Sequence, residues 1–213
     1  MSQQHLDDFI KQLIPDMQPV WSEVEELPGF EWYLLNPECE QQQLQTQQVG
    51  AFWQSLPYWA FAWAGGVALS KYLLTKPELV QGKRVLDFGC GSGLAGVVAA
   101  KLGATTVDCC DLDELALIAA ELNAERNGVK VSGIRDWQNN EYDCLIAADV
   151  LYDLTSVPDL VEHCGKIPAW IVAETNFQTP PWQDIQKVAS LRASTWPRLD
   201  DFDDQVEVNI FQR

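Results

Sequence analysis

The chain has 213 residues, of which 47% are hydrophobic and 21% charged, a composition typical of a folded globular protein. Its 14 Lys and Arg residues against 31 Asp and Glu residues give a formal net charge of −17. Such a charge repels phosphate backbones and anionic lipid headgroups, so it disfavours binding to nucleic acid or to a membrane surface. A basic protein partner would be attracted instead.

The six cysteines show neither a C-x-x-C pair nor the spacing of zinc ligands, and the two histidines are isolated, so we expect no metal site. The first residues, MSQQHLDDFIKQL, lack the basic and apolar regions of a signal peptide. No apolar run approaches the roughly 18 residues that cross a membrane. We therefore expect a cytoplasmic protein that does not span a membrane, and a monomer.

The pattern of the chain changes near residue 80. The segment before residue 58 is interrupted by prolines and contains a glutamine-rich stretch at 41–48, so we expect an irregular or helical appendage with a polar loop. Apolar residues at helical spacing predict a helix over 66–75, which Pro77 ends. The predicted division is an N-terminal appendage over 1–80 and one structural unit over 81–213.

After residue 83, segments typical of strands alternate with segments typical of helices. The predicted strands cover 84–89, 105–111, 129–134, 142–149 and 169–174, and the predicted helices cover 94–103, 114–128 and 157–164. Apolar strands separated by helices indicate a doubly wound, mostly parallel α/β sheet. Two more strands, in RASTWP and QVEVNIF, are too close for a helical crossover and should form a C-terminal antiparallel hairpin. The prediction is a seven-stranded, Rossmann-like sheet.

A glycine-rich turn, DFGCGSGLAG, follows the first predicted strand. Glycine at Gly89, Gly91 and Gly93 lets the backbone turn tightly and approach a ligand in front of a helix N-terminus. Two cofactors fit this outline. For a nicotinamide cofactor, Gly91, Gly93 and Gly96 spell G-x-G-x-x-G, and Asp111 follows about 20 residues later as the ribose-binding acid.

Asp87, two positions before Gly89, distinguishes the two cofactors. A carboxylate pointed at the loop repels a pyrophosphate but suits a ligand that has an ammonium group and no phosphate. S-adenosylmethionine (SAM) is such a ligand, because it combines an amino acid, a sulfonium, a ribose and an adenine. The alternative is that Asp87 only caps the turn through backbone N–H groups.

The string D-x-G-x-G-x-G resembles motif I of the class I, seven-strand SAM-dependent methyltransferases. The resemblance implies that Asp111 binds the ribose and that Leu112 next to it belongs to the cofactor site. It also implies that Asp136 accepts a hydrogen bond from the adenine amine and that Trp137 packs on the adenine ring. The alternative for these last two is a loop acid beside a core tryptophan.

Two further segments resemble the electron-transfer-flavoprotein β-subunit lysine methyltransferases and the wider group with a D-x-x-Y motif. They are YWAFAWAGG over 58–66, and Asp149 with Tyr152 after the fourth predicted strand; LLNPEC over 34–39 adds to the likeness. The resemblance implies a SAM-dependent N-methyltransferase that acts on a lysine in a basic segment of a protein, with the appendage over 1–80 packed over the cofactor site.

Four residues are expected to surround the reacting groups. Asp149 should face the sulfonium methyl group and hold the N–H groups of the amine, with Glu174 as the second choice for that role. Tyr152 should wall the pocket or bind Asp149, and the ring of Trp63 should lie over the methionine part of the cofactor. Three alternatives stay open: methylation of a small amine or heterocycle, a non-catalytic SAM-binding protein, and a dehydrogenase.

The choice between cofactors is tested by calorimetric titration of the purified protein with SAM, with its demethylated product S-adenosylhomocysteine (SAH), and with NAD. We expect SAM and SAH to bind and NAD not to bind, because the charge of Asp87 disfavours a pyrophosphate in the loop. Tight binding of NAD without binding of SAM would contradict this prediction.

Overall fold

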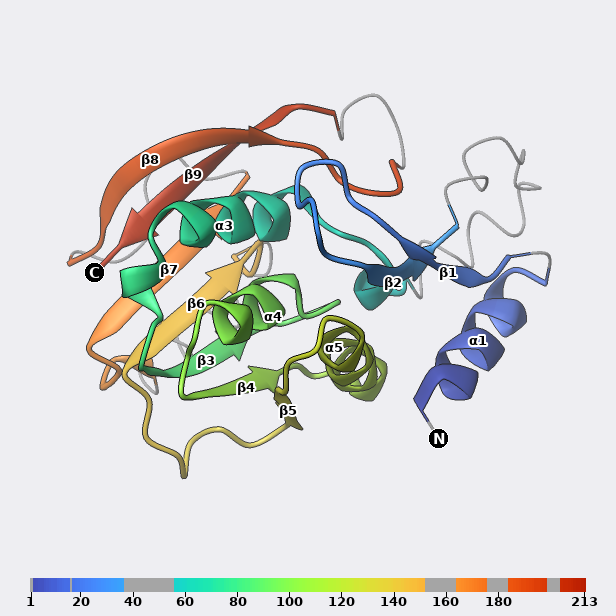
Figure 1. The fold of residues 1–213 in the computed structure, drawn as a ribbon, viewed down its shortest axis with the longest axis horizontal. Coiled ribbons are helices and arrows are strands. Elements are labelled where there is room, and N and C mark those ends of the chain that lie inside the picture. Colours follow the sequence, from blue (N-terminus) through green and yellow to red (C-terminus); the bar gives the residue numbers. More distant parts are fainter. Residues whose placement is uncertain (1, 16, 37–55, 152–163, 176–183, 199–203) are drawn as a thin grey trace.

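The computed structural model describes residues 2–15, 17–36, 56–151, 164–175, 184–198 and 204–213 (Figure 1). Its centre is a seven-stranded sheet in the order β5-β4-β3-β6-β7-β9-β8. The strands are β3 (Arg84–Phe88), β4 (Thr106–Cys110), β5 (Ser132–Ile134), β6 (Cys144–Ala148), β7 (Ala169–Glu174), β8 (Gln186–Ala193) and β9 (Val206–Gln212). The five strands from β3 to β7 are parallel, so their carboxyl ends meet at one edge of the sheet.

The C-terminal strands form the predicted antiparallel hairpin, and β9 inserts between β7 and β8. The structure places β8 over Gln186–Ala193, earlier in the chain than the predicted RASTWP segment. This strand lies at the edge of the sheet and is largely exposed. Its sequence is therefore polar, and a pattern of apolar residues does not indicate it. The pairing of β8 with β9 shifts register between Lys187 and Ala189.

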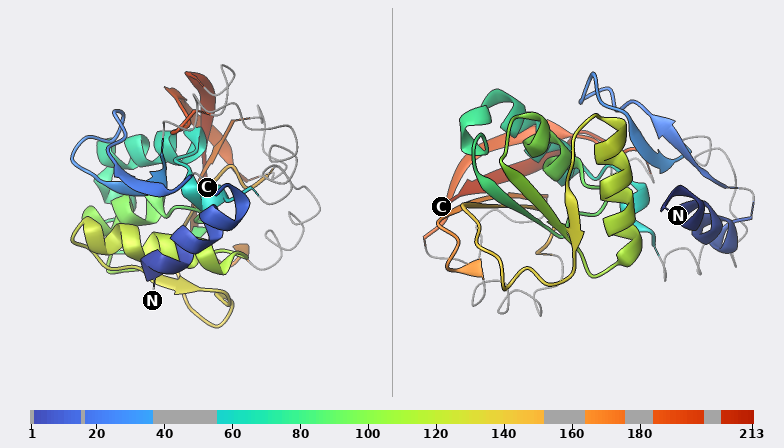
Figure 2. Two further views of the ribbon diagram at one scale, coloured as in Figure 1. Left: turned by 90° about the vertical axis from the view of Figure 1, so that its right-hand side faces the viewer. Right: turned by 60° about the horizontal axis from the view of Figure 1, so that its bottom comes forward.

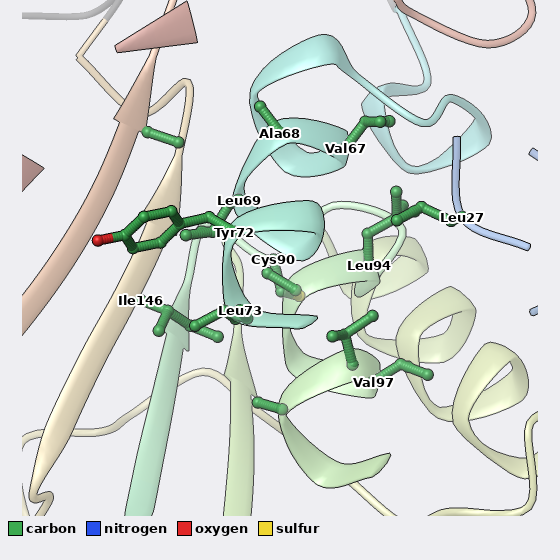
Figure 3. Packing of buried hydrophobic residues seen from close by; sticks show 14 of the residues in the cluster. Leu27, Val67, Ala68, Leu69, Tyr72, Leu73, Cys90, Leu94, Val97 and Ile146 are labelled. Atoms are coloured by element: carbon green, nitrogen blue, oxygen red, sulfur yellow. The ribbon is translucent and has the colours of Figure 1, made fainter. Parts of the chain in front are cut away.

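Both faces of the sheet are buried, which explains why its central strands are apolar throughout. Along β6, Cys144 and Ile146 pack in one cluster, whereas Leu145 and Ala147 pack in the other. The helices α3 (Ala64–Thr75) and α4 (Leu94–Lys101) cover the first face; Figure 3 shows Leu73 of α3 close to Ile146. Helix α5 (Glu114–Arg126) continues this layer beside α4. The doubly wound sheet is confirmed.

The N-terminal part is more regular than its prolines suggest. It forms the helix α1 (Ser2–Leu13), an antiparallel pair of β1 (Pro19–Ser22) and β2 (Trp32–Leu35), and the short 3₁₀ helix η2 (Tyr58–Ala60). Leu6, Ile10 and Ile14 are spaced four apart, so they form an apolar stripe, and α1 packs against α5 (Figure 2). The predicted helix over 157–164 lies almost entirely outside the described residues.

Helix α3 packs on the sheet itself, in contact with β6, β7, β8 and β9. The division of the chain at residue 80 stays a prediction.

In the part of the chain that the structure describes, no helix combines the length and the apolar character needed to cross a membrane.

Candidate active site

The glycine turn lies between β3 and α4, at the edge where the parallel strands end. Gly89, Gly91 and Gly93 have φ angles of 67°, 52° and 78°, in the left-handed region that favours glycine. A Cβ atom on Gly93 would lie only 2.6 Å from Cβ of Ala120, so the turn rests directly on α5. Its backbone conformation and its close packing both require glycine here.

Asp87 is buried beneath this turn, with 3% of its surface exposed. Its Oδ2 accepts a hydrogen bond of 2.9 Å from the Gly96 amide in the first turn of α4. Burial raises the pKa of the Asp87 carboxyl to about 7, although the Gly96 hydrogen bond lowers it. This hydrogen bond fits the alternative interpretation, in which Asp87 caps the turn through backbone N–H groups. Recognition of the cofactor ammonium by its charge stays a prediction.

Asp111 follows β4 and holds the glycine turn from the neighbouring strand. Its Oδ2 accepts from the Gly91 amide at 2.9 Å, and its Oδ1 accepts from the Asp113 amide at 3.0 Å. Leu112, between the two acids, is 90% exposed. An acid and an exposed apolar side chain at this edge fit a ribose diol and the flat face of an adenine.

Asp136 and Trp137 follow β5 at the same edge. Asp136 is exposed, and its Oδ1 and Oδ2 accept from the Gln138 amide at 3.1 Å and the Asn139 side chain at 3.2 Å. The Trp137 ring is half-buried and meets Phe88 edge-on, with 6.1 Å between centroids. The structure thus brings this pair to the strand ends, whereas their binding of adenine stays a prediction.

The aromatic segment borders the glycine turn from the other side. Trp63 precedes α3, and its Nε1 donates to the Tyr58 carbonyl at 2.9 Å. The Trp63 ring lies 5.7 Å from the ring of Tyr58 and 5.3 Å from that of Phe61, between centroids. The Tyr58 carbonyl is 3.9 Å from the place of a Cβ atom on Gly91. Tyr58 is 49% exposed at this border. The sequence alone did not separate it from the aromatic residues expected in the core.

Asp149, directly after β6, joins three segments of the chain. Its φ of 51° is unusual for a residue with a side chain. The backbone N–H donates to the Ala173 carbonyl at 2.9 Å. The carboxylate accepts from two amides: Oδ2 from Gly65 of α3 at 2.9 Å, and Oδ1 from Thr175 after β7 at 3.1 Å. Burial raises the pKa of this carboxyl.

Glu174, the last residue of β7, makes the reciprocal contact. It is 2% exposed, and its Oε1 accepts from the amides of Val150 at 3.0 Å and Leu151 at 3.2 Å. Burial, and after it the nearby charge of Asp149, raises the pKa of Glu174 to about 8. Asp149 therefore binds the backbone that follows Glu174, and Glu174 binds the backbone that follows Asp149. Tyr152 lies outside the described residues.

Within the described ranges, no group of three His, Cys, Asp or Glu side chains is arranged to hold a metal ion. The site consists of backbone amides, carboxyl groups and aromatic rings. Its features fit SAM: carboxyl groups favour the ammonium and sulfonium charges, and the exposed side chain of Leu112 offers an apolar surface on which an adenine can pack.

Comparison with known proteins also leads to SAM-dependent methyltransferases. Residues 68–169 match the family model of ribosomal protein L11 methyltransferase (PrmA). The human electron transfer flavoprotein beta subunit lysine methyltransferase is 33% identical over 153 residues, 70% of this chain and 57% of that protein. The ribosomal protein L11 methyltransferase of Vibrio parahaemolyticus is 43% identical over 79 residues, 37% of this chain and 27% of that protein.

A solved structure from Pyrococcus horikoshii, provisionally named as an RNA methyltransferase, shares the fold. Its TM-score is 0.54 at 20% identity, with 68% of this chain and 82% of that chain covered. The fold, the glycine turn and the matched sequences all indicate a class I SAM-dependent methyltransferase. Within this class, the chain is similar to the β-subunit lysine methyltransferases, and it spans somewhat under three fifths of the human relative's length.

Gly65→Ala tests the position of the Asp149 carboxylate without changing that residue. A Cβ atom on Gly65 would lie 2.2 Å from Asp149 Oδ2, so the flexible carboxylate must swing away and lose its backbone bonds. We expect the free energy of unfolding to fall by about 1–3 kcal/mol and methyl transfer to fall at least about tenfold. Chemical denaturation and single-turnover transfer measure the two effects.

Gly66→Ala is the matched control, because its Cβ atom would meet only Leu94 Cβ at an ordinary 3.9 Å. Alanine also favours the helix over glycine by about 1 kcal/mol, so this variant should be as stable as the natural protein or more so. Full methyl transfer by Gly65→Ala would show that the position of the Asp149 carboxylate is unimportant.

The raised pKa of Glu174 predicts how stability depends on pH. This carboxyl is protonated in the folded protein up to about pH 8 but ionised in the unfolded chain above about pH 4.5, so unfolding releases a proton between these values. Rising pH therefore reduces the free energy of unfolding by up to about 1.4 kcal/mol per pH unit from this group. Glu174→Gln should lose that part of the slope in urea denaturation between pH 5 and about pH 8. Equal slopes for the two proteins would contradict the assignment.

Proposed function

We propose that the protein transfers methyl groups from SAM to lysine side chains of a protein substrate. The observation that carries the proposal is the pair of buried carboxyl groups, Asp149 and Glu174, at the ends of adjacent strands beside the cofactor turn. Among the residues that the structure describes, neither carboxyl group is bonded to a Lys or Arg side chain. Glu174 is protonated below about pH 8, so the charge of Asp149 is the one that complements a positively charged substrate.

The chemistry requires a neutral amine. A lysine with a pKa near 10.4 is only about one part in 10³ neutral at physiological pH, which costs roughly 4 kcal/mol. A buried site reduces that cost, because desolvation disfavours the ammonium form. The carboxyl oxygens can accept the remaining N–H groups of the amine and aim its lone pair. SAM supplies a methyl group on a sulfonium; the N–C bond forms as the S–C bond breaks, and the amine proton leaves to solvent.

Similarity to protein methyltransferases supports a protein acceptor. The human relative is named for a lysine of the flavoprotein β subunit, and the matched family model for a ribosomal protein. The net charge of −17 also favours a basic segment as the substrate. The monomeric state and the cytoplasmic location stay predictions alongside this function.

Transfer of tritiated methyl from SAM into a cell lysate tests the proposal. We expect label in a discrete protein band with the natural protein and not with Asp149→Asn. Asparagine removes the charge, and its amide would also oppose a backbone N–H of Gly65 or Thr175, so Gly65→Ala serves as the parallel variant with the acid retained. Mass spectrometry of the band should find methylated lysine. Label confined to small molecules would contradict a protein substrate and favour the small-amine alternative.

A further inference from the structure

Helix α5 and the residue that follows it carry two buried asparagines one turn apart, and both bind the β2 region. Asn123 has 0% of its surface exposed and Asn127 9%. Asn127 forms hydrogen bonds with both backbone groups of Glu31: its Oδ1 accepts from the Glu31 amide at 3.1 Å, and its Nδ2 donates to the Glu31 carbonyl at 2.8 Å. Buried amide groups of this kind need such partners, because leaving them unpaired is costly.

Asn123 makes a different pair of contacts, since it joins β2 to the glycine turn. Its Oδ1 accepts from the Tyr33 amide at 2.7 Å, and its Nδ2 donates to the Ser92 carbonyl at 2.8 Å. Ser92 is 3% exposed, and its hydroxyl donates to the Phe61 carbonyl at 2.9 Å. The centre of the turn is therefore held by α5 on one side and by the aromatic segment on the other.

The connection extends to the first helix. The Tyr33 hydroxyl donates to Asp7 and accepts from Gln3 Nε2 at 3.1 Å, both in α1. Hydrogen bonds thus run from α1 through Tyr33 and Asn123 to Ser92. The amide that follows Ser92, that of Gly93, closes the turn by donating to the Cys90 carbonyl at 2.7 Å. The orientation of the Ser92 carbonyl and of the Gly93 amide is set together, because both belong to one planar peptide.

We propose that Asn123 is a positioning residue for the cofactor, and that through it the N-terminal part of the chain holds the glycine turn in its binding conformation. The inference rests on the SAM site proposed above. A turn that is already ordered binds its ligand more tightly than one that must be ordered on binding. Coupling of this kind is reciprocal, so cofactor binding should also stabilise the docking of β2 on α5.

The test compares Asn123→Ala with Asn127→Ala by calorimetric titration with SAH. Both variants weaken the docking of the β2 region, but only the first removes the bond to Ser92. We expect the Kd for SAH to rise about tenfold with Asn123→Ala, a loss of about 1.4 kcal/mol, and less than about threefold with Asn127→Ala. An unchanged Kd in Asn123→Ala, or equal weakening in both, would overturn the proposal.

Two further measurements separate positioning from general stability. At saturating SAM, Asn123→Ala should keep kcat within about twofold while the KM for SAM rises. If this variant does not fold, Asn123→Asp keeps the acceptor for Tyr33 but loses the amide donor to Ser92, and should weaken SAH binding likewise. In the natural protein, SAH should slow the hydrogen exchange of the β2 amides. An unchanged exchange rate would contradict the coupling. The titration contains no methyl acceptor, so a wrong substrate assignment would leave its result intact.

Discussion

Backbone amides at the carboxyl edge of the sheet are satisfied by acids from neighbouring strands, and this arrangement holds the site together. Asp87 binds the first turn of α4, Asp111 binds the glycine turn, and Asp149 and Glu174 bind each other's following segments. Loops that leave a buried sheet present backbone N–H groups that need hydrogen-bond acceptors. Carboxyl groups accept these hydrogen bonds, and they gather where a sulfonium cofactor and an amine substrate are expected. Burial in this arrangement raises the pKa of Asp87, Asp149 and Glu174.

The sequence predicts the sheet well because its central strands are apolar and its turns carry glycine. It also identifies the acids, since each lies within two residues of the end of a strand. It does not show what those acids bind. Asp149 contacts Gly65, 84 residues earlier, and Thr175, 26 residues later, and the sequence carries no local sign of either contact. The polar edge strand β8 was misplaced for the related reason that exposed strands lack an apolar pattern.

The asparagines of α5 are a different case, because a sequence signal for them exists. Ala116, Ala120, Asn123 and Asn127 follow helical spacing, and the structure buries all four. A polar residue on the buried stripe of a helix needs a partner, so both asparagines could have been singled out on that ground. Their partners, Tyr33 in β2 and Glu31 just before it, could not be identified, since nothing in residues 1–57 predicts which strand lies on α5. The N-terminal part is thus attached to the cofactor turn by buried polar bonds, and the apolar stripe of α1 attaches it to α5.

The contact between Gly65 and Asp149 has a consequence for how this protein can change over evolution. A side chain at position 65 and an acid at position 149 compete for the same space, since a Cβ atom there would fall within 2.2 Å of the carboxylate. Substitution of the glycine displaces the carboxylate, so the acid keeps its position only while residue 65 has no side chain. The two positions therefore constrain each other, although 84 residues separate them in the chain.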